Sequence, residues 1–451
     1  MTREKKQVDM LHGSLADKLI LFALPLALSS ILQQLFNSAD VAVVGRFAGS
    51  QALAAVGANV ANVAVFVNLL VGMSIGPNVV IARLIGQGKE EEISCAVRTI
   101  MTMALLIGGG LMVLGWCIAG PLLGATNTPS EVLADAKLYF RIYIICVPFI
   151  TLFNFGSAIL RSVGDTKRPM YIMLISGIAN VLLNLFFVIV CHMGVAGVAL
   201  ATLISNILSA GLILYLLTRE KGSIRLQGFQ PELDMKYVRN VLQVGIPSGF
   251  QGMIFSLSNI FIQSGINSFG ASTVAASSVA LNFEYFAYAV SSAFAQGAVT
   301  FVSQNFGAKQ INRCRKIYWL ALAEGMICTA MLSFVFTVKA RWFAGIYTTE
   351  PEVVEIAVVR MLHVMSLEAL TVTYEVSAGT LRSIGYQLIP ALFTVLGTVG
   401  LRILWMYTVF RKIPTFEMLM NVYPVSWVFT GITLMTAYFI LWRRMTQNNY
   451  K

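Results

Sequence analysis

Long apolar segments constrain this chain more than any other feature of its sequence. Hydrophobic residues make up 57% of the chain and charged residues only 12%, whereas soluble domains average about half and about a quarter. A helix that spans a membrane needs roughly 20 predominantly apolar residues, and the sequence offers about twelve such stretches. They are predicted near residues 15–44, 53–82, 99–119, 138–160, 169–191, 194–217, 240–267, 273–303, 317–338, 354–381, 388–410 and 416–442. We therefore predict an all-α polytopic membrane protein.

The basic residues that give the chain a net charge of +11 are concentrated in alternate connectors. The amino-terminal segment before residue 15 and the connector near 218–239 are two of these. Because Lys and Arg are enriched in cytoplasmic loops, both termini are predicted to be cytoplasmic. This distribution explains the charge better than nucleic-acid binding does. The polar, charged segment before the first predicted span has no small-residue cleavage site, which argues against a removable signal peptide.

The two halves of the chain resemble each other at an offset of about 221 residues. The sequence Leu160–Gly164 recurs as Leu381–Gly385, and Pro25 corresponds to Pro247. With six spans in each copy, the chain returns to the side where it began, so the repeat is parallel, as in several transporter architectures. We predict two parallel six-helix lobes around a central cleft. The predicted lobes are residues 1–225, which hold a cation or proton site, and residues 226–451.

A polar stripe in the first apolar segment is the strongest candidate for a functional site. Gln33, Asn37 and Asp40 recur at helical spacing, so they share one face of a helix. An ionisable residue inside a membrane is costly, which by default indicates a function. The alternative is that the two amides only hold neighbouring helices together. Pro25 removes a backbone hydrogen bond from the same segment and can bend it.

Counting from the span ends places three further polar residues at a depth similar to that of Asp40. Asn180 and Asn184 lie one turn apart on the fifth segment, and Thr202 lies inside the sixth. One carboxylate with amide and hydroxyl oxygens suits a hard monovalent cation such as sodium. The same carboxylate could take up a proton, since burial favours the neutral acid. An interhelical hydrogen-bond network without an ion remains the alternative.

An acid among aromatic residues is the candidate substrate site of the second lobe. Glu284 lies in mid-span beside Phe283 and near Tyr288. This surrounding could hold an organic cation through cation–π contacts. The alternative is an aromatic packing layer in which Glu284 pairs with a neighbouring residue.

Other intramembrane charges of the second lobe are interpreted as structural. Glu368 and Glu375 lie roughly on one face of the tenth segment, and Arg402 of the eleventh is expected to pair with one of them. Arg360 is expected to extend towards the lipid headgroups.

Chemistry that depends on enzyme motifs or metal clusters is not indicated. The sequence has no HExxH motif, and its histidines His12, His192 and His363 are far apart. The six cysteines are scattered without CxxC spacing, which argues against zinc and against a disulfide framework. We therefore expect neither an enzyme nor a cofactor.

At this point the residues resemble the multidrug and toxic compound extrusion (MATE) transporters over essentially the whole chain. The resemblance is carried by Pro25 with Asn37-Ser38-Ala39-Asp40 and Val44-Gly45, and by the repeated Leu160–Gly164. It implies a multi-pass secondary antiporter of the cytoplasmic (inner) membrane. Such a protein exports cationic, amphiphilic compounds by alternating access, against an inward flow of H⁺ or Na⁺.

The resemblance also implies roles for particular residues. Asp40, Asn180, Asn184 and Thr202 match positions that line the cation or proton site. Some relatives have a second aspartate at the position of Asn184. One branch has a glutamate at the position of Phe255, so the second-lobe cation site of that branch is not expected here.

Two other classes of membrane protein are alternatives to a transporter of this family. A lipid-linked saccharide flippase on a related scaffold should have several cations in its cleft, whereas the buried charges predicted here are mostly acidic. A channel filter is typically built from rings in symmetric assemblies, and the sequence shows none. The expected partners are membrane lipid and small organic cations, without nucleic acid, and the chain is expected to be a monomer.

Overall fold

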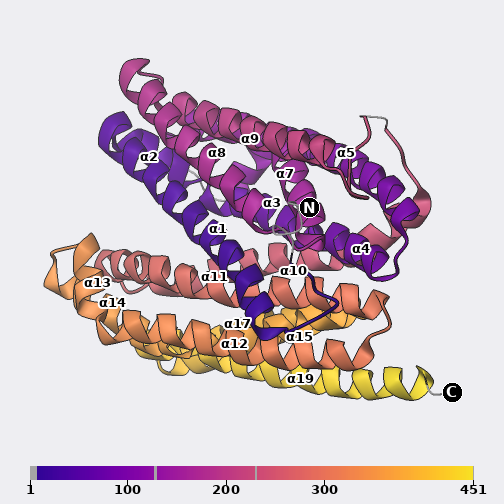
Figure 1. Ribbon diagram of the computed structural model, residues 1–451. Coiled ribbons are helices and arrows are strands. Elements are labelled where there is room, and N and C mark those ends of the chain that lie inside the picture. Colours follow the sequence, from indigo (N-terminus) through magenta and orange to yellow (C-terminus); the bar gives the residue numbers. More distant parts are fainter. Residues whose placement is uncertain (1–7, 126–128, 229–230, 450–451) are drawn as a thin grey trace. The chain divides into compact units, whose positions relative to one another are not determined.

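The structure is a computed structural model that describes residues 8–125, 129–228 and 231–449 (Figure 1). Within these ranges the regular structure is entirely helical, which confirms the predicted all-α class. The helices of the first half are α1 (Ala16–Val43), η2 (Val44–Ala48), α2 (Gly49–Gly57), α3 (Val60–Met73), α4 (Ile75–Gly86), α5 (Glu90–Ala125), α6 (Leu133–Ile144), α7 (Val147–Ser162), α8 (Lys167–Leu185), η3 (Phe186–Val190) and α9 (Gly194–Arg219). The second half contains α10 (Met235–Asn267), α11 (Ala271–Gly307), α12 (Ile311–Val338), α13 (Ala340–Tyr347), α14 (Pro351–His363), η4 (Met365–Leu370), α15 (Thr371–Ser383), α16 (Leu388–Thr394), η5 (Val395–Gly400), α17 (Leu401–Trp405), η6 (Met406–Phe410), α18 (Phe416–Met420) and α19 (Val422–Asn449).

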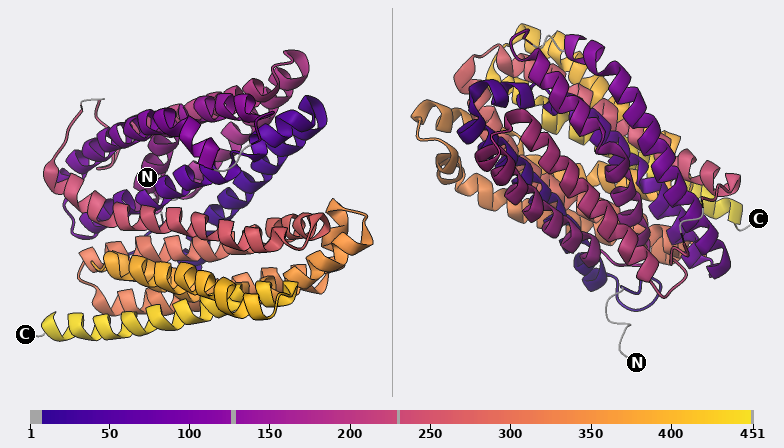
Figure 2. Two further views of the ribbon diagram at one scale, coloured as in Figure 1. Left: turned by 180° about the vertical axis from the view of Figure 1, so that it is seen from behind. Right: turned by 90° about the horizontal axis from the view of Figure 1, so that it is seen from above.

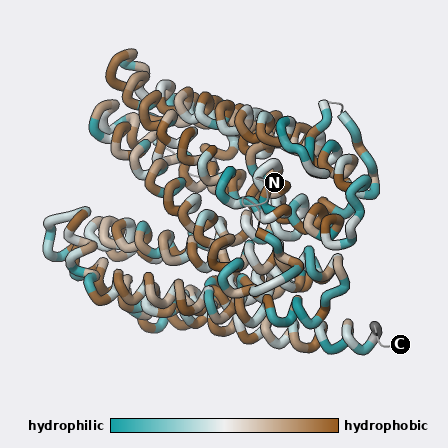
Figure 3. Tube along the Cα trace, in the orientation of Figure 1, coloured by the Kyte–Doolittle hydropathy of each residue, from teal (hydrophilic) through white to brown (hydrophobic). Residues whose placement is uncertain are grey.

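The helices are long and apolar enough for a multi-pass membrane protein. Nine segments of the described chain meet that criterion, and the bent pair of α6 and α7 makes ten. Two further predicted spans are helical but more polar, namely α10 and the stretch from α14 to α15, which η4 interrupts. With these two included, the helices correspond to the predicted spans. Helices suit a bilayer because they satisfy their own backbone hydrogen bonds. In Figure 3 the apolar colour follows most helices, and hydrophilic residues gather at helix ends and connectors.

The first helical segment is longer than its sequence predicts. The second span was expected to begin near residue 53, but η2 and α2 continue the first segment to Gly57. The break comes at Asn59, whose buried amide nitrogen donates to Ala55 O at 2.9 Å and to Ala136 O at 3.0 Å. A turn held by a buried amide leaves no charged connector in the sequence to mark the boundary.

The described helices form two compact units, which are treated separately below. The first comprises Val8 and Leu28–Met253, and the second comprises Asp9–Ala27 and Ile254–Lys451. Helix α1 is continuous through Pro25, and its residues are assigned to the first unit from Leu28 onward.

Close helix packing organises the first unit. Helices α8 and α9 form a hairpin and lie side by side in Figures 1 and 2. Glycines allow α10 to approach α3 and α4 at backbone distance. A Cβ atom at Gly72 would lie 2.4 Å from Ser248 O, and one at Gly76 would lie 2.4 Å from Val241 O. Residues Gly72–Gly76 spell GxSxG, but the Ser74 hydroxyl donates to Val71 O at 2.7 Å, so this pattern serves helix packing.

The second unit is built around α11. This helix packs against α12, α14 and α15. It is the least apolar of the nine candidate spans, yet most of its residues are buried. Most of this helix therefore faces protein, including the polar side chains of Glu284 and Ser291.

Candidate functional site

The site of the first unit centres on Asp40, a half-buried residue near the carboxyl-terminal end of α1. Asn184 on α8 donates from Nδ2 to Asp40 Oδ1 at 2.5 Å. Its side chain is fully buried. Hydrogen bonds to an ionised carboxylate are shorter and stronger than neutral ones. The first-span acid and the fifth-span amide therefore meet, as depth counting predicted.

Asn180 brings a second amide to the same carboxylate from one helical turn earlier on α8. With its amide nitrogen turned towards α1, Asn180 donates to Asp40 Oδ1 at 2.7 Å and to Oδ2 at 3.3 Å. In this orientation the amide oxygen of Asn180 lies 3.4 Å from Ser205 Oγ on α9. Two amides spaced four residues apart on one helix face thus converge on one acid.

A glycine on α8 allows α1 to come close enough for these contacts. A Cβ atom at Gly177 would lie 1.9 Å from the ring of Phe36 on α1. Phe36 precedes Asp40 by one turn, and Gly177 precedes Asn184 by about two turns. The packing of Phe36 over Gly177 therefore sets the separation at which Asp40 reaches the amides.

One acceptor in the site lacks a partner. Asn184 Oδ1 is buried and has no hydrogen-bond partner among the described residues. A buried unsatisfied oxygen is costly, so this atom is available to a cation or to a donor that enters the site. It adds a third oxygen to the two of the Asp40 carboxylate.

Thr202 is less directly connected than its depth suggests. Its hydroxyl donates to Val198 O at 3.0 Å, a bond to its own helix that is common for threonine. Ser205 links it to the network, because Ser205 Oγ donates to Thr202 O at 2.9 Å. The polar network thus reaches Thr202 through its backbone and not through its hydroxyl.

Two tyrosines of α6 lie near the carboxylate, and the sequence analysis did not single them out. Tyr139 and Tyr143 are within electrostatic range of Asp40. Their rings stack with centroids 6.1 Å apart. Their spacing of one helical turn on the fourth predicted span was the available signal, since counting depth on that span would have placed them with Asp40.

Gln33 and Asn37, the other two predicted residues of the α1 stripe, are not joined to Asp40 by the hydrogen bonds of the described residues. Both have exposed side chains. Pro25 is buried. The supporting role of the stripe and the bending role of Pro25 remain predictions.

A buried ion pair occupies the predicted aromatic layer of the second unit. Arg360 on α14 donates to both carboxylate oxygens of Glu284 on α11, at 2.7 Å and 2.9 Å. The two side chains are only 1% and 9% exposed. The expectation that Arg360 extends towards the headgroups is therefore wrong. An arginine fork that finds a carboxylate inside the protein has no need of the membrane surface.

The other candidate substrate residues also have partners within the second unit. Phe283 packs among aromatic rings, with centroids 5.2 Å from Phe336 and 5.4 Å from Phe343. The Tyr288 hydroxyl donates to Glu375 at 2.9 Å. These contacts are those of the packing alternative, and a role in substrate binding remains a prediction.

Arg402 does not form the ion pair predicted for it. Its Nη1 donates to Asn259 Oδ1 at 3.0 Å, and its guanidinium carbon lies 4.7 Å from the ring of Tyr423. Neither Glu368 nor Glu375 lies within ion-pair distance of it in the described structure. An amide acceptor and an aromatic face take the place of a carboxylate beside this buried cation, whose Nε has no hydrogen-bond partner among the described residues.

The part of the chain that the structure describes forms no cluster of typical transition-metal ligands. The described residues contain no group of three His, Cys, Asp or Glu side chains that could hold a metal ion. A cation at Asp40 would therefore be bound by one carboxylate and neutral oxygens, the ligand set of weakly held alkali ions or protons.

Comparison with known proteins shows the family to which this chain belongs. The MatE family model matches the chain twice, over residues 25–186 and 247–408, which confirms the internal duplication. The probable multidrug resistance protein YoeA of Bacillus subtilis is 24% identical over 390 residues, covering 85% of this chain and 84% of YoeA. A FAD transporter of Shewanella oneidensis is 24% identical over 327 residues, covering 71% of this chain and 72% of that protein.

A solved structure shows the same fold. The crystal structure of the Vibrio cholerae MATE transporter VcmN in the bent form matches with a TM-score of 0.85 at 21% identity, covering 95% of this chain and 97% of that chain. The resemblance drawn from the first-span acid and the duplicated motif is thereby confirmed. The chain is a multi-pass membrane transporter and not an enzyme, and it belongs to the MatE family, the multidrug and toxic compound extrusion (MATE) transporters.

Proposed function

We propose that this protein is a secondary antiporter that exports cationic or amphiphilic compounds, driven by inward flow of a proton or sodium ion that binds at Asp40. The observation that supports this most strongly is the carboxylate of Asp40 held by two buried amides of α8. A membrane-embedded acid with a specific polar setting is the usual mark of an ion pathway. The name of the relative YoeA supports multidrug export.

The coupling follows from the contacts of the carboxylate. An ion that binds at Asp40 competes with the amide donors of Asn180 and Asn184 for the same oxygens. Ion binding and the packing of α1 on α8 are therefore linked equilibria, and each must change the other by the same factor. In this proposal the linked change moves the two lobes, residues 1–225 and 226–451, so that the substrate is reached alternately from each side of the membrane. The protein acts as a monomer in the inner membrane with both termini cytoplasmic.

Both coupling ions are compatible with the side chains present. A proton needs one carboxylate oxygen. Sodium needs several oxygens, and the site offers two from Asp40 with the unpartnered Oδ1 of Asn184. Bound water would have to complete a sodium shell, because the Thr202 hydroxyl is turned towards its own helix.

The test is ethidium efflux from proteoliposomes that hold the purified protein, with the proton and sodium gradients imposed separately. We expect one gradient to drive efflux, and Asp40→Asn to abolish the driven component while ethidium still binds. The asparagine keeps the shape of the side chain and removes its ability to hold a cation. Because one relative is named a FAD transporter, FAD is tested as a second substrate.

Asp135→Asn is the matched control, because it makes the same change of charge on α6 at a residue that forms no contact with Asp40 in the described network. It should leave driven efflux unchanged. Undiminished gradient-driven efflux by Asp40→Asn would refute the proposal. If neither imposed gradient drives efflux by the parent protein, coupling to these two ions is excluded.

A further inference from the structure

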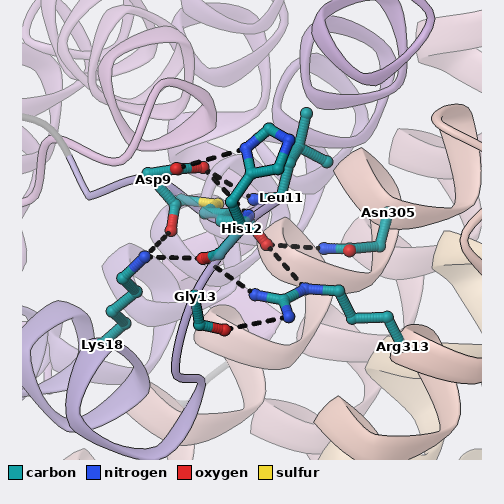
Figure 4. Close-up of polar contacts among 8 residues, drawn as sticks. Asp9, Leu11, His12, Gly13, Lys18, Asn305 and Arg313 are labelled. Carbon is teal, nitrogen blue, oxygen red and sulfur yellow. Dashed lines mark hydrogen bonds and ion pairs between the residues drawn. The ribbon is translucent and has the colours of Figure 1, made fainter.

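The amino-terminal segment Asp9–Gly13 forms a turn whose backbone carbonyls point at two basic side chains (Figure 4). Arg313, in the first turn of α12, donates to Met10 O at 3.4 Å, to His12 O at 3.1 Å and to Gly13 O at 3.0 Å. Lys18, in the first turn of α1, donates to Asp9 O at 2.8 Å and to His12 O at 2.7 Å. We call this turn, with Lys18 and Arg313, the clasp.

The clasp is closed by further contacts within the second unit. Asp9 Oδ1 accepts from the backbone amides of Leu11 at 3.0 Å and His12 at 3.2 Å, which holds the turn in shape. Asn305 on α11, itself fully buried, donates to Met10 O at 3.0 Å. The Met10 side chain is 1% exposed. An amino-terminal segment is normally loosely held, so this degree of burial and bonding indicates a specific attachment.

The chemistry of the clasp requires arginine. All three acceptors of Arg313 are backbone carbonyls that approach one planar fork of donors. A lysine is a point charge on a flexible stem and cannot meet three carbonyls in this arrangement. The cations therefore hold the turn through its backbone, while the side chains of Asp9 and Met10 shape and bury it.

We propose that Arg313 is a positioning residue for transport, because the clasp fixes the amino-terminal end of α1, the helix that carries Asp40 near its other end. This inference rests on the proposed coupling at Asp40. Coupling between distant sites is carried by rigid elements that have two discrete arrangements, and the clasp restrains one end of such an element. With the clasp released, ion binding at Asp40 is taken up by movement of the loose end, and fewer cycles complete export.

The first measurement reports on the clasp alone and needs no transport. A nitroxide label is attached to His12→Cys, an exposed side chain, in a background without other cysteines, and its mobility is read by electron paramagnetic resonance. We expect the label to be less mobile in the parent protein than in Arg313→Gln, because the side chain is exposed but the backbone of the turn is held. Lys316→Gln, an exposed position on the same helix, is the matched control and should leave the spectrum as in the parent.

The second measurement separates positioning from folding. Arg313→Gln should lower the maximal rate of ethidium efflux at least about tenfold, because it loses more than one of the three charged hydrogen bonds of Arg313 and each is worth about tenfold or more on a two-state equilibrium. The apparent KM should stay unchanged, because no clasp residue is assigned to the substrate site. Arg313→Lys should restore part of the rate, and Lys18→Gln, which removes the other cation, should lower it.

Two results would overturn the inference. One is a label in Arg313→Gln that is no more mobile than in the parent protein, which would mean that Arg313 does not hold the turn. The other is a mobile label together with a parental efflux rate, which would mean that the held turn does not position α1. If Arg313→Gln fails to fold, Arg313→Lys and Lys18→Gln carry both readouts. Failure of the coupling proposal itself would appear in Asp40→Asn and would leave the label result intact.

Discussion

Removal of one partner from the buried pair of Glu284 and Arg360 should strongly destabilise the protein. In Glu284→Gln the side chain keeps its shape but loses its charge, so the guanidinium of Arg360 is left buried without a counter-ion. Arg360 cannot turn to water, since its side chain is 1% exposed. Breaking a buried ion pair in this way costs about 3–5 kcal/mol.

The size of the effect follows from the geometry. The two bonds of 2.7 Å and 2.9 Å form a fork that uses both carboxylate oxygens, and Gln can replace only one of these acceptors. Replacing both residues by apolar side chains of similar volume removes the desolvation cost together with the attraction. Glu284→Leu with Arg360→Met should therefore lie within about 1–2 kcal/mol of the parent protein.

The assay is reversible unfolding of the purified protein in mixed micelles, with the free energy of unfolding measured for both single variants and the double variant. Glu417→Gln, an exposed acid on α18, is the control and should change stability by less than about 0.5 kcal/mol. A loss below about 1 kcal/mol in Glu284→Gln would refute the reasoning. The same variant tests the predicted role of Glu284 in substrate binding. If Glu284 binds substrate, Glu284→Gln should bind ethidium more weakly while its stability stays near the parental value.

Two further predictions concern helix packing and pH. Gly177→Ala should force Phe36 away and cost about 1–3 kcal/mol with a loss of driven efflux, whereas Gly211→Ala, with nothing within 4 Å of its Cβ, should be tolerated in both the unfolding and the efflux assay. The hydrogen bond from Arg98 lowers the pKa of Glu232, which lies in the connector outside the membrane segments. The stability that this bond contributes is thus present above the ordinary pKa of glutamate and is lost as pH falls through the lowered one. In Arg98→Gln the connector should be released at higher pH than in the parent protein, as measured by limited proteolysis across a pH series. The bond should contribute less than about 1 kcal/mol to the stability of the connector.

The fold was predictable because the length and apolarity of each span are local properties of the sequence. The boundary that failed shows the limit of this reasoning. Residues 44–57 continue the first segment, and the turn that ends them depends on the bonds of Asn59, one of them to Ala136 far along the chain. A partner at that separation leaves no trace in the local pattern.

The candidate site was predictable where depth and helical spacing decide the contact. Asp40 and Asn184 meet because each lies near the outer end predicted for its span. The contacts of the second lobe were harder to predict, because several buried charges lie at similar depths and depth alone does not identify their partners. Arg360 pairs with Glu284 across 76 positions, and Arg402 turns to Asn259, so rotation about each helix axis decides the partner.

The burial of α11 has a consequence for how the protein is made. This helix is the least apolar candidate span, and its Glu284 would meet hydrocarbon if the helix entered the bilayer alone. A charge at the centre of an isolated helix raises the free energy of insertion by about 2.5–3.5 kcal/mol. Its packing partners α12, α14 and α15 are all synthesised after it. We therefore expect α11 to enter the lipid less readily alone than together with the helices that bury Glu284.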